Sequence, residues 1–357
     1  MATNAGNDGL PKRPTRDDVA MLAGVSSAVV SYVLNNGPRP VAAATRERVL
    51  DAVRQLDYVP NQIARSLAGS STRTIGLIAP TLANPVWAEL AMGITDVALP
   101  RSNLLMVCNV EGNADLDMHY ASTLASKRVD GIIVVPTADP GLLLEAMGKA
   151  HIPVVVVERE TPGVPSVVVD AVATGHVATE HLLNLGHKHV AFLREHRSGL
   201  DSWQRFDGYR AALTEADITF DPSLVADAGP NIDGKSIVEA GRTAANTLLD
   251  AERRPTAVFA HNDLIAIAVV QEARRRGLEV PADLSVIGVD DTEAGRYGDP
   301  ALTTVAFPSR ELGRAAAELL LGMATGQDQP VLTVISRGKV LVRDSTAPPP
   351  RRAPDHT

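Results

Sequence analysis

From Thr74 onward, short apolar runs alternate with longer amphipathic stretches, and this rhythm constrains the fold more than any other feature of the sequence. The short runs, such as "DGIIVVP" and "PVVVVE", are continuously apolar and do not alternate with polar residues. Strands of this kind are expected where helices cover both faces of a parallel sheet. The repeated order of strand and helix therefore predicts doubly wound α/β units.

The predicted strands and helices fill most of the chain. We expect strands at 74–80, 103–109, 130–136, 153–158, 166–170, 189–194, 256–261 and 284–290, and helices at 85–99, 113–127, 140–149, 172–185, 203–215, 233–250, 262–276 and 309–325. This region of roughly 270 residues is long for one sheet, so we expect two α/β lobes.

Residues 15–60, which we call the headpiece, carry a different pattern of three short helical segments, near 16–23, 27–35 and 44–56. Between the first two, Gly24 can adopt a positive φ, and Ser26 can cap the second helix, as Thr15 can cap the first. Small apolar residues on both segments allow a close crossing. This is the geometry of a helix-turn-helix, whose second helix lies in a DNA major groove. From these residues alone, an ordinary αα-hairpin is the alternative.

The charge distribution separates the two regions. Residues 1–73 hold nine Lys and Arg against six Asp and Glu, whereas the remainder holds 25 against 36. A basic module on an acidic body suggests a nucleic-acid partner for the module.

Composition excludes several other classes of protein. The single cysteine, Cys108, allows no disulfide framework and is expected to be a small buried residue. No apolar run approaches the roughly 18 residues of a membrane span, and the N-terminus lacks the apolar core of a secretion signal. We therefore expect a cytoplasmic protein without membrane contact. Residues 1–14 and 346–357 are polar or rich in proline and are expected to be disordered.

The segment "DVAMLAGVSSAVVSYVLNN" resembles the headpiece of the lactose/galactose repressor (LacI/GalR) family, whose pattern is D-V-A-x-x-A-G-V-S-x-x-T-V-S-x-V-L-N. The resemblance continues through "TRERVLDAVRQLDYVPNQIARSLA", "TIGLIAP", "NPVWAEL", "HLLNLGHKHVAFL", "QRFDGYRAAL", "AVFAHNDLIAIAVV", "GLEVPADLSVIGVDD" and "ALTTV". It covers roughly residues 15–345 in colinear order. It implies a transcriptional regulator, expected to be a repressor, that binds a near-palindromic operator as a homodimer and needs no cofactor.

The resemblance also implies which residues contact DNA. Ser27, Ala28 and Tyr32 occupy positions that face base edges, although Val29 replaces the usual Thr and Tyr32 a frequent Arg. A hinge helix within 61–73 is expected to order on DNA, where Leu67 wedges into the minor groove. Alternatively, Leu67 packs on the body, and Arg46 and Arg48 lie on a solvated face. The full set expected at the DNA is Ser27, Ala28, Ser31, Tyr32, Asn35, Thr45, Arg46, Asn61, Ala64 and Leu67.

For residues 74–345 the resemblance implies a body like the periplasmic binding proteins, with an effector in the cleft between its lobes. Lobe one is expected at 74–170 and 308–336, and lobe two at 171–305 and 337–345. The effector is expected to be a small polar molecule, a sugar first and a nucleobase as the alternative, acting as inducer or corepressor. The expected effector residues are Asn84, Trp87, Glu158, Arg205, Asn262, Asp263 and Asp290. Alternatively, Asn84 and Asp263 only cap their helices, and Arg205 and Asp290 are structural.

Two other functions fit the sequence less well. The histidines, including His176, His181, His187 and His189, form no metalloprotease motif, and no nucleophile elbow, Walker loop or dinucleotide fingerprint is present, so we expect no enzyme and no metal site. A periplasmic solute-binding protein would fit the body but not the basic headpiece.

Overall fold

The computed structural model describes residues 14–35, 39–59, 71–111, 113–195, 201–229, 237–324, 330–335 and 338–350. The chain divides into two compact units, residues 1–72 and 73–357. The predicted hinge residues Asn61, Ala64 and Leu67 lie outside the described residues, as do the predicted disordered ends at 1–13 and 351–357.

The first unit contains the headpiece helices α1 (Arg16–Ala23), α2 (Ser27–Asn35) and α3 (Ala43–Gln55). Its core is aliphatic and includes Val19, Val30 and Val49, each fully buried. No single helix in the described ranges is long and apolar enough to cross a membrane; α1 and α2 pass that test only as a pair, bent by 102°.

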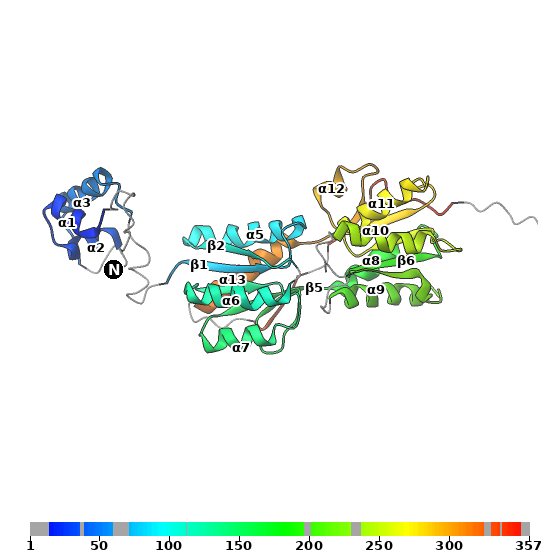
Figure 1. Ribbon diagram of the computed structural model, residues 1–357, viewed down its shortest axis with the longest axis horizontal. Helices are drawn as coiled ribbons and strands as arrows, with labels where there is room; N and C mark the ends of the chain where they lie inside the picture. Colours follow the sequence, from blue (N-terminus) through cyan, green and yellow to red (C-terminus); the bar gives the residue numbers. More distant parts are fainter. Residues whose placement is uncertain are drawn as a thin grey trace, which may run out of the picture. The chain divides into compact units, whose positions relative to one another are not determined.

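The first lobe of the second unit is built on a parallel sheet with the strand order β11-β5-β4-β3-β1-β2. Its strands are β1 (Thr74–Ala79), β2 (Leu104–Asn109), β3 (Gly131–Val134), β4 (Val154–Val157), β5 (Ser166–Val169) and β11 (Leu332–Ile335). One face of the sheet is covered by α5 (Pro85–Ala98), which η1 (Leu99–Arg101) continues, and by α13 (Ser309–Ala324). The other face is covered by α6 (Ala114–Ser126) and α7 (Gly141–Lys149) (Figure 1).

The second lobe repeats this plan with the strand order β12-β10-β9-β8-β6-β7, in which β12 alone pairs antiparallel. Its strands are β6 (Val190–Glu195), β7 (Val225–Ala228), β8 (Ala257–Ala260), β9 (Ser285–Asp290), β10 (Thr303–Ala306) and β12 (Val340–Leu341). One face of this sheet is covered by α8 (Ala171–Asn184) and α9 (Asp201–Glu215), and the other face by α10 (Ile237–Leu249) and α11 (Asp263–Arg275). The lobe also contains two short helices, η2 (Pro222–Leu224) and α12 (Glu293–Arg296). The prediction of two doubly wound lobes is confirmed.

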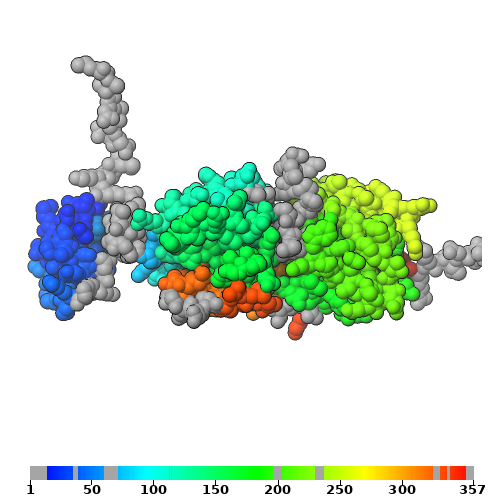
Figure 2. Space-filling model, turned by 90° about the horizontal axis from the view of Figure 1, so that it is seen from below, coloured from blue at the N-terminus to red at the C-terminus, as the bar shows by residue number. Residues whose placement is uncertain are grey.

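The chain passes between the two sheets after β5, after β10 and after β11. As a result α13, which follows β10 of the second lobe in sequence, packs on α5 of the first lobe. Figure 2 shows this late segment, in orange, against the cyan and blue-green surface of the first lobe.

Sequence patterns missed β7, β10, β11, β12 and α12, and the omission of β7, β10 and β11 has a physical reason. Strands β7 and β10 carry Asp or Thr among their apolar residues, and β11 has alternately exposed residues because it lies at the edge of its sheet. The buried hydroxyls of Thr303 and Thr304 are hydrogen-bonded, which allows polar residues inside a sheet.

The expectation of disorder from residue 346 is wrong for Thr346 and Ala347. The Thr346 hydroxyl lies 3.1 Å from His181 Nε2, and the Ala347 carbonyl accepts a hydrogen bond from Ser285 Oγ at 2.9 Å. These contacts extend the ordered body beyond the composition change that suggested a tail.

Candidate DNA-binding and effector sites

The turn between α1 and α2 is formed as the sequence predicts. Gly24 ends α1 in the left-handed region, with φ 62°, and the Ser26 hydroxyl accepts a hydrogen bond from the Val29 amide at 3.4 Å. At the start of α1, Thr15 and Asp18 form a reciprocal capping box. The angle of 102° between the helices lies within the range of helix-turn-helix motifs.

Helix α2 turns Val30 and Val33 into the headpiece core, and another side of the helix carries residues that the sequence predicts to contact DNA. That side includes the exposed Ala28 and the half-buried Tyr32 and Ser27, and the Ser27 hydroxyl donates a hydrogen bond to the Asp17 carboxylate of α1. Among the other residues expected at the DNA, Ser31 and Thr45 are half-buried, Arg46 is exposed, and the side chain of Asn35 lies outside the described residues.

In the body, a pocket lies at the carboxyl ends of the strands, where the chain crosses between the lobes. It is lined by Glu158, Val169, Ala171, Thr174, Arg205 and Phe307. Of the predicted effector residues, Glu158 and Arg205 therefore belong to its wall. Sequence patterns missed Phe307 and Thr174, although their positions just after β10 and within the first turn of α8 are signals that a search of strand ends would use.

Arg205 of α9 is buried, with only 6% of its surface exposed. One terminal nitrogen donates to the His261 carbonyl at 2.8 Å, and the guanidinium carbon lies 5.7 Å from the centre of the Phe307 ring. Its buried Nε has no hydrogen-bond partner among the described residues. A buried donor without a partner is costly, so this nitrogen is suited to bind a polar ligand atom.

The backbone of Arg205 is fixed by a close contact with α8. A Cβ added at Gly175 would lie 2.0 Å from the Arg205 carbonyl oxygen, and one added at Gly208 would lie 2.0 Å from the Val172 carbonyl oxygen. Glycine at both positions lets α8 and α9 touch at their backbones.

Asn84 and Asp290 meet across the two lobes. The Asn84 amide nitrogen donates to the Asp290 carboxylate at 3.4 Å, while its oxygen accepts from the Val86 amide at 3.2 Å and so caps α5. Burial raises the pKa of Asp290 well above its usual range, and the nearby carboxylates of Asp263 and Glu158 raise it further. The charge of Arg205 and the hydrogen bond from Asn84 act in the opposite direction and lower this pKa. Asn84 therefore caps its helix, as one of the two sequence alternatives predicted, and also joins the two lobes.

Two cleft carboxylates lie on unusual backbone. Glu158 has φ 64° and Asp290 has φ 126°, followed by Asp291 at φ 62°. Non-glycine residues in the left-handed region are uncommon and concentrate at functional sites. The strand ends therefore turn sharply at the points where these acids meet the cleft.

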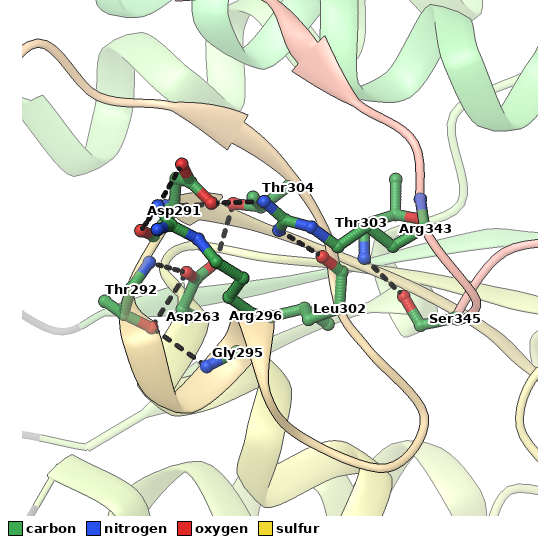
Figure 3. Close-up of polar contacts among 10 residues, drawn as sticks. All are labelled: Asp263, Asp291, Thr292, Gly295, Arg296, Leu302, Thr303, Thr304, Arg343 and Ser345. Atoms are coloured by element: carbon green, nitrogen blue, oxygen red, sulfur yellow. Dashed lines mark hydrogen bonds and ion pairs between the residues drawn. The ribbon is translucent and has the colours of Figure 1, made fainter.

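Asp263 is a structural residue, which corrects its assignment to the effector. It is fully buried and accepts hydrogen bonds from the Thr292 amide at 2.7 Å, the Thr292 hydroxyl at 3.0 Å and the Thr304 hydroxyl at 2.7 Å. Figure 3 shows this group beside Asp291, which lies between Arg296 and Arg343. The carboxylate joins α11 to β10 and α12, and this leaves it turned toward protein donors.

Asn262 and Trp87 also have structural roles here. Asn262 caps α11 by accepting from the Ile265 amide at 3.0 Å, and its amide nitrogen donates to Glu195 at 3.1 Å. Trp87 is 3% exposed and packs in the apolar core of the first lobe. It has no open ring face for a sugar, because the first turns of α5 bury their apolar side chains against the sheet.

Comparisons with known proteins agree with this architecture. The family model described as "Bacterial regulatory proteins, lacI family" matches residues 15–61, and "Periplasmic binding protein-like domain" matches residues 179–346. The chain is 34% identical to the HTH-type transcriptional repressor PurR of Aliivibrio fischeri (strain ATCC 700601 / ES114) over 338 residues, which cover 93% of this chain and 98% of that protein.

Two solved structures are similar over nearly the whole chain. The lac repressor dimer bound to operator and the anti-inducer ONPF has a TM-score of 0.82 at 27% identity, covering 94% of this chain and 100% of that one. A complex of the transcriptional regulator CelR with cellobiose has a TM-score of 0.68 at 30% identity, covering 93% and 100%.

Proposed function

Because the chain belongs to the LacI family of bacterial regulatory proteins and is a DNA-binding transcriptional repressor, not an enzyme, we propose that a small polar effector bound in the cleft controls its affinity for an operator. In this proposal residues 15–60 contact DNA, residues 61–73 form the hinge, and residues 74–345 bind the effector and dimerise. The site of action is the cytoplasm, where the chromosome lies.

The single observation that carries the effector proposal is Arg205. Its guanidinium is buried at the cleft with an unpartnered Nε, close to Phe307 in the pocket wall. A ligand oxygen would satisfy this donor, and the carboxylates of Glu158 and Asp290 would accept from ligand hydroxyl groups.

We propose a sugar as the effector class, with a nucleobase as the alternative. Hydroxyl groups pair with a guanidinium and carboxylates at the same time, and the CelR structure is a cellobiose complex of a similar protein. Phe307 supplies the aromatic face that sequence reasoning assigned to Trp87. A bound effector would contact both lobes and so change their relative position, and the resulting coupling to DNA is reciprocal.

At the DNA, we propose that α2 lies in the major groove and that Ser27, Ala28 and Tyr32 face base edges. Ser31, Asn35, Thr45 and Arg46 would contact phosphates, which position the protein without specifying sequence. The hinge residues Asn61, Ala64 and Leu67 would lie at the minor groove.

We also propose a homodimer formed along β2. This strand lies at the edge of its sheet, and Leu104 and Val107 are exposed, as are Met92 and Leu99 of the neighbouring α5 and η1. An exposed apolar edge strand is a site for pairing with another chain. Two headpieces would then contact the two halves of a near-palindrome.

The first test is to incubate the full-length protein with a pool of random duplex DNA at fixed salt and to sequence the bound fraction. The proposed function predicts enrichment of a near-palindrome with a flexible pyrimidine–purine step at its centre. Thermal unfolding with cellobiose, ribose or hypoxanthine then tests the effector class, since a ligand of the folded state raises the Tm. Binding that shows no sequence preference, with or without these compounds, would overturn the proposal.

A further inference from the structure

The hydrogen bond between Ser27 and Asp17 joins the two helices of the DNA-binding motif. Ser27 is the first residue of α2 and donates its hydroxyl proton to the carboxylate of Asp17, the second residue of α1. The core residues Val19, Ala23 and Val30 hold the two helices together, and the capping box of Thr15 fixes the start of α1. The relative position of the two side chains therefore follows from the fold of the headpiece.

This contact determines what the Ser27 hydroxyl can offer to DNA. A hydroxyl has one proton and two lone pairs, whereas a carboxylate only accepts hydrogen bonds. The Ser27 proton is therefore committed to Asp17, and Ser27 Oγ faces outside partners as an acceptor.

The major groove offers few partners for an acceptor. Its donors are the exocyclic amino groups of adenine N6 and cytosine N4, whereas guanine O6 and N7 and thymine O4 are acceptors. An acceptor-only hydroxyl thus distinguishes adenine and cytosine from guanine and thymine on the strand that it contacts.

The neighbouring side chains of α2 offer little competing base recognition, so the preference set by the Ser27 hydroxyl matters for the operator sequence. Ala28 is exposed and has no polar side-chain atom, and the first turn of α2 carries no arginine or amide side chain that would make a bidentate contact with a base. Resting on the proposed function, which puts α2 in the major groove, we propose that Asp17 is a specificity-determining residue. It orients the Ser27 hydroxyl so that the operator carries adenine or cytosine at the base facing Ser27.

Removal of Asp17 has two separable effects. The lost negative charge strengthens binding to DNA of every sequence, because phosphate contacts dominate affinity. The freed Ser27 proton becomes available to guanine or thymine, which relaxes the preference at one base only.

The test is selection of bound DNA from a random duplex pool by full-length wild type, Asp17→Ala, Ser27→Ala and the double variant. Wild type is expected to prefer adenine or cytosine by roughly three- to tenfold at one position of each half-site, the range of one net hydrogen bond. Ser27→Ala abolishes this preference, Asp17→Ala weakens it, and the double variant equals Ser27→Ala. The matched control is Glu47→Ala, which removes an exposed headpiece charge and leaves every base preference unchanged.

Three results would overturn the inference while leaving the proposed function intact. Wild type could select guanine or thymine at the base whose preference is lost in Ser27→Ala, or Asp17→Ala could keep the full wild-type preference. In the third case, Ser27→Ala changes the preference at no base. A pool without any enriched sequence would instead overturn the proposed function, and the role of Asp17 with it.

Discussion

Asn84 and Asp290 are separated by 206 positions in sequence, yet the Asn84 amide donates a hydrogen bond to the Asp290 carboxylate at 3.4 Å. The contact joins the first residue before α5 in one lobe to the last residue of β9 in the other. A ligand that competes for either group changes what holds the lobes together at this edge. In the proposed function, an effector that competes for these groups would act directly on the relative position of the lobes.

Arg205→Ala is expected to abolish the effector response and to leave operator affinity intact, because Arg205 lies in the body and not in the headpiece. Loss of one or two charge-assisted hydrogen bonds should weaken effector binding by roughly 10- to 100-fold. Titration calorimetry with the compound found by the thermal screen measures this. Arg210→Ala, an exposed arginine on the same helix, is the control and should bind normally. An undiminished response of Arg205→Ala would remove Arg205 from the site.

Gly175→Ala is expected to destabilise the body by about 1–3 kcal/mol, the usual cost of overpacking. The added Cβ would lie 2.0 Å from the Arg205 carbonyl oxygen, so α8 and α9 must separate and Arg205 must shift. Urea unfolding measures the stability, and effector affinity should fall as well. Gly148→Ala is the matched control, since a Cβ there meets nothing within 4 Å. It should stabilise α7 by up to about 1 kcal/mol. Equal unfolding free energies for the two variants would contradict the conclusion that the close contact between α8 and α9 requires glycine at position 175.

Asp263 is expected to make stability depend on pH. Burial raises the pKa of Asp263 from 3.8 to about 6, so the folded state holds the proton more tightly than the unfolded state does. The stabilisation of the folded state by this proton is therefore fully present below about pH 4 and is lost as the pH rises through about 6. A shift of this size corresponds to about 3 kcal/mol at most.

Asp263→Asn cannot titrate at this position. The unfolding free energy of wild type minus that of the variant should therefore decrease as the pH is raised from about 4 to about 6. Urea unfolding of both proteins across this range measures the difference. Parallel curves would show that Asp263 titrates alike in the folded and unfolded chain.

Leu104→Glu is expected to shift the protein from dimer to monomer, raising the dimer Kd at least 10-fold. Leu104 is 63% exposed on the edge strand β2, so a charge there costs the monomer little but is buried in the proposed interface. Sedimentation velocity measures the assembly. Leu142→Glu, 73% exposed on α7, is the control and should remain dimeric. A Leu104→Glu dimer as tight as wild type would place the interface elsewhere.

Leu67→Ala is expected to raise the operator Kd by roughly 10- to 100-fold without changing the fold, because the hinge would lose its apolar wedge at the minor groove. Fluorescence anisotropy with the selected operator measures affinity, and circular dichroism checks the fold. An unchanged Kd would favour the alternative that Leu67 only packs on the body.

Elements whose signals are local could be predicted from the amino-acid sequence. Continuous apolar runs identified most strands of both sheets, since residues buried on both faces must be apolar whatever their neighbours are. The turn at Gly24 and Ser26 was equally predictable, because a positive φ and a helix cap depend only on adjacent residues. The order of these elements was enough to predict two lobes and a separate headpiece.

The direction in which the polar side chains turn depends on packing between distant segments. Asp263 follows a strand as a ligand-binding acid would, but its donors are Thr292 and Thr304, which the fold brings to it from later in the chain. Trp87 lies one turn from the cleft and yet packs in the core, whereas Phe307 reaches the pocket through a crossover between the lobes. A local pattern shows that a residue lies at a strand end; its partners depend on long-range packing, which no short stretch of sequence encodes.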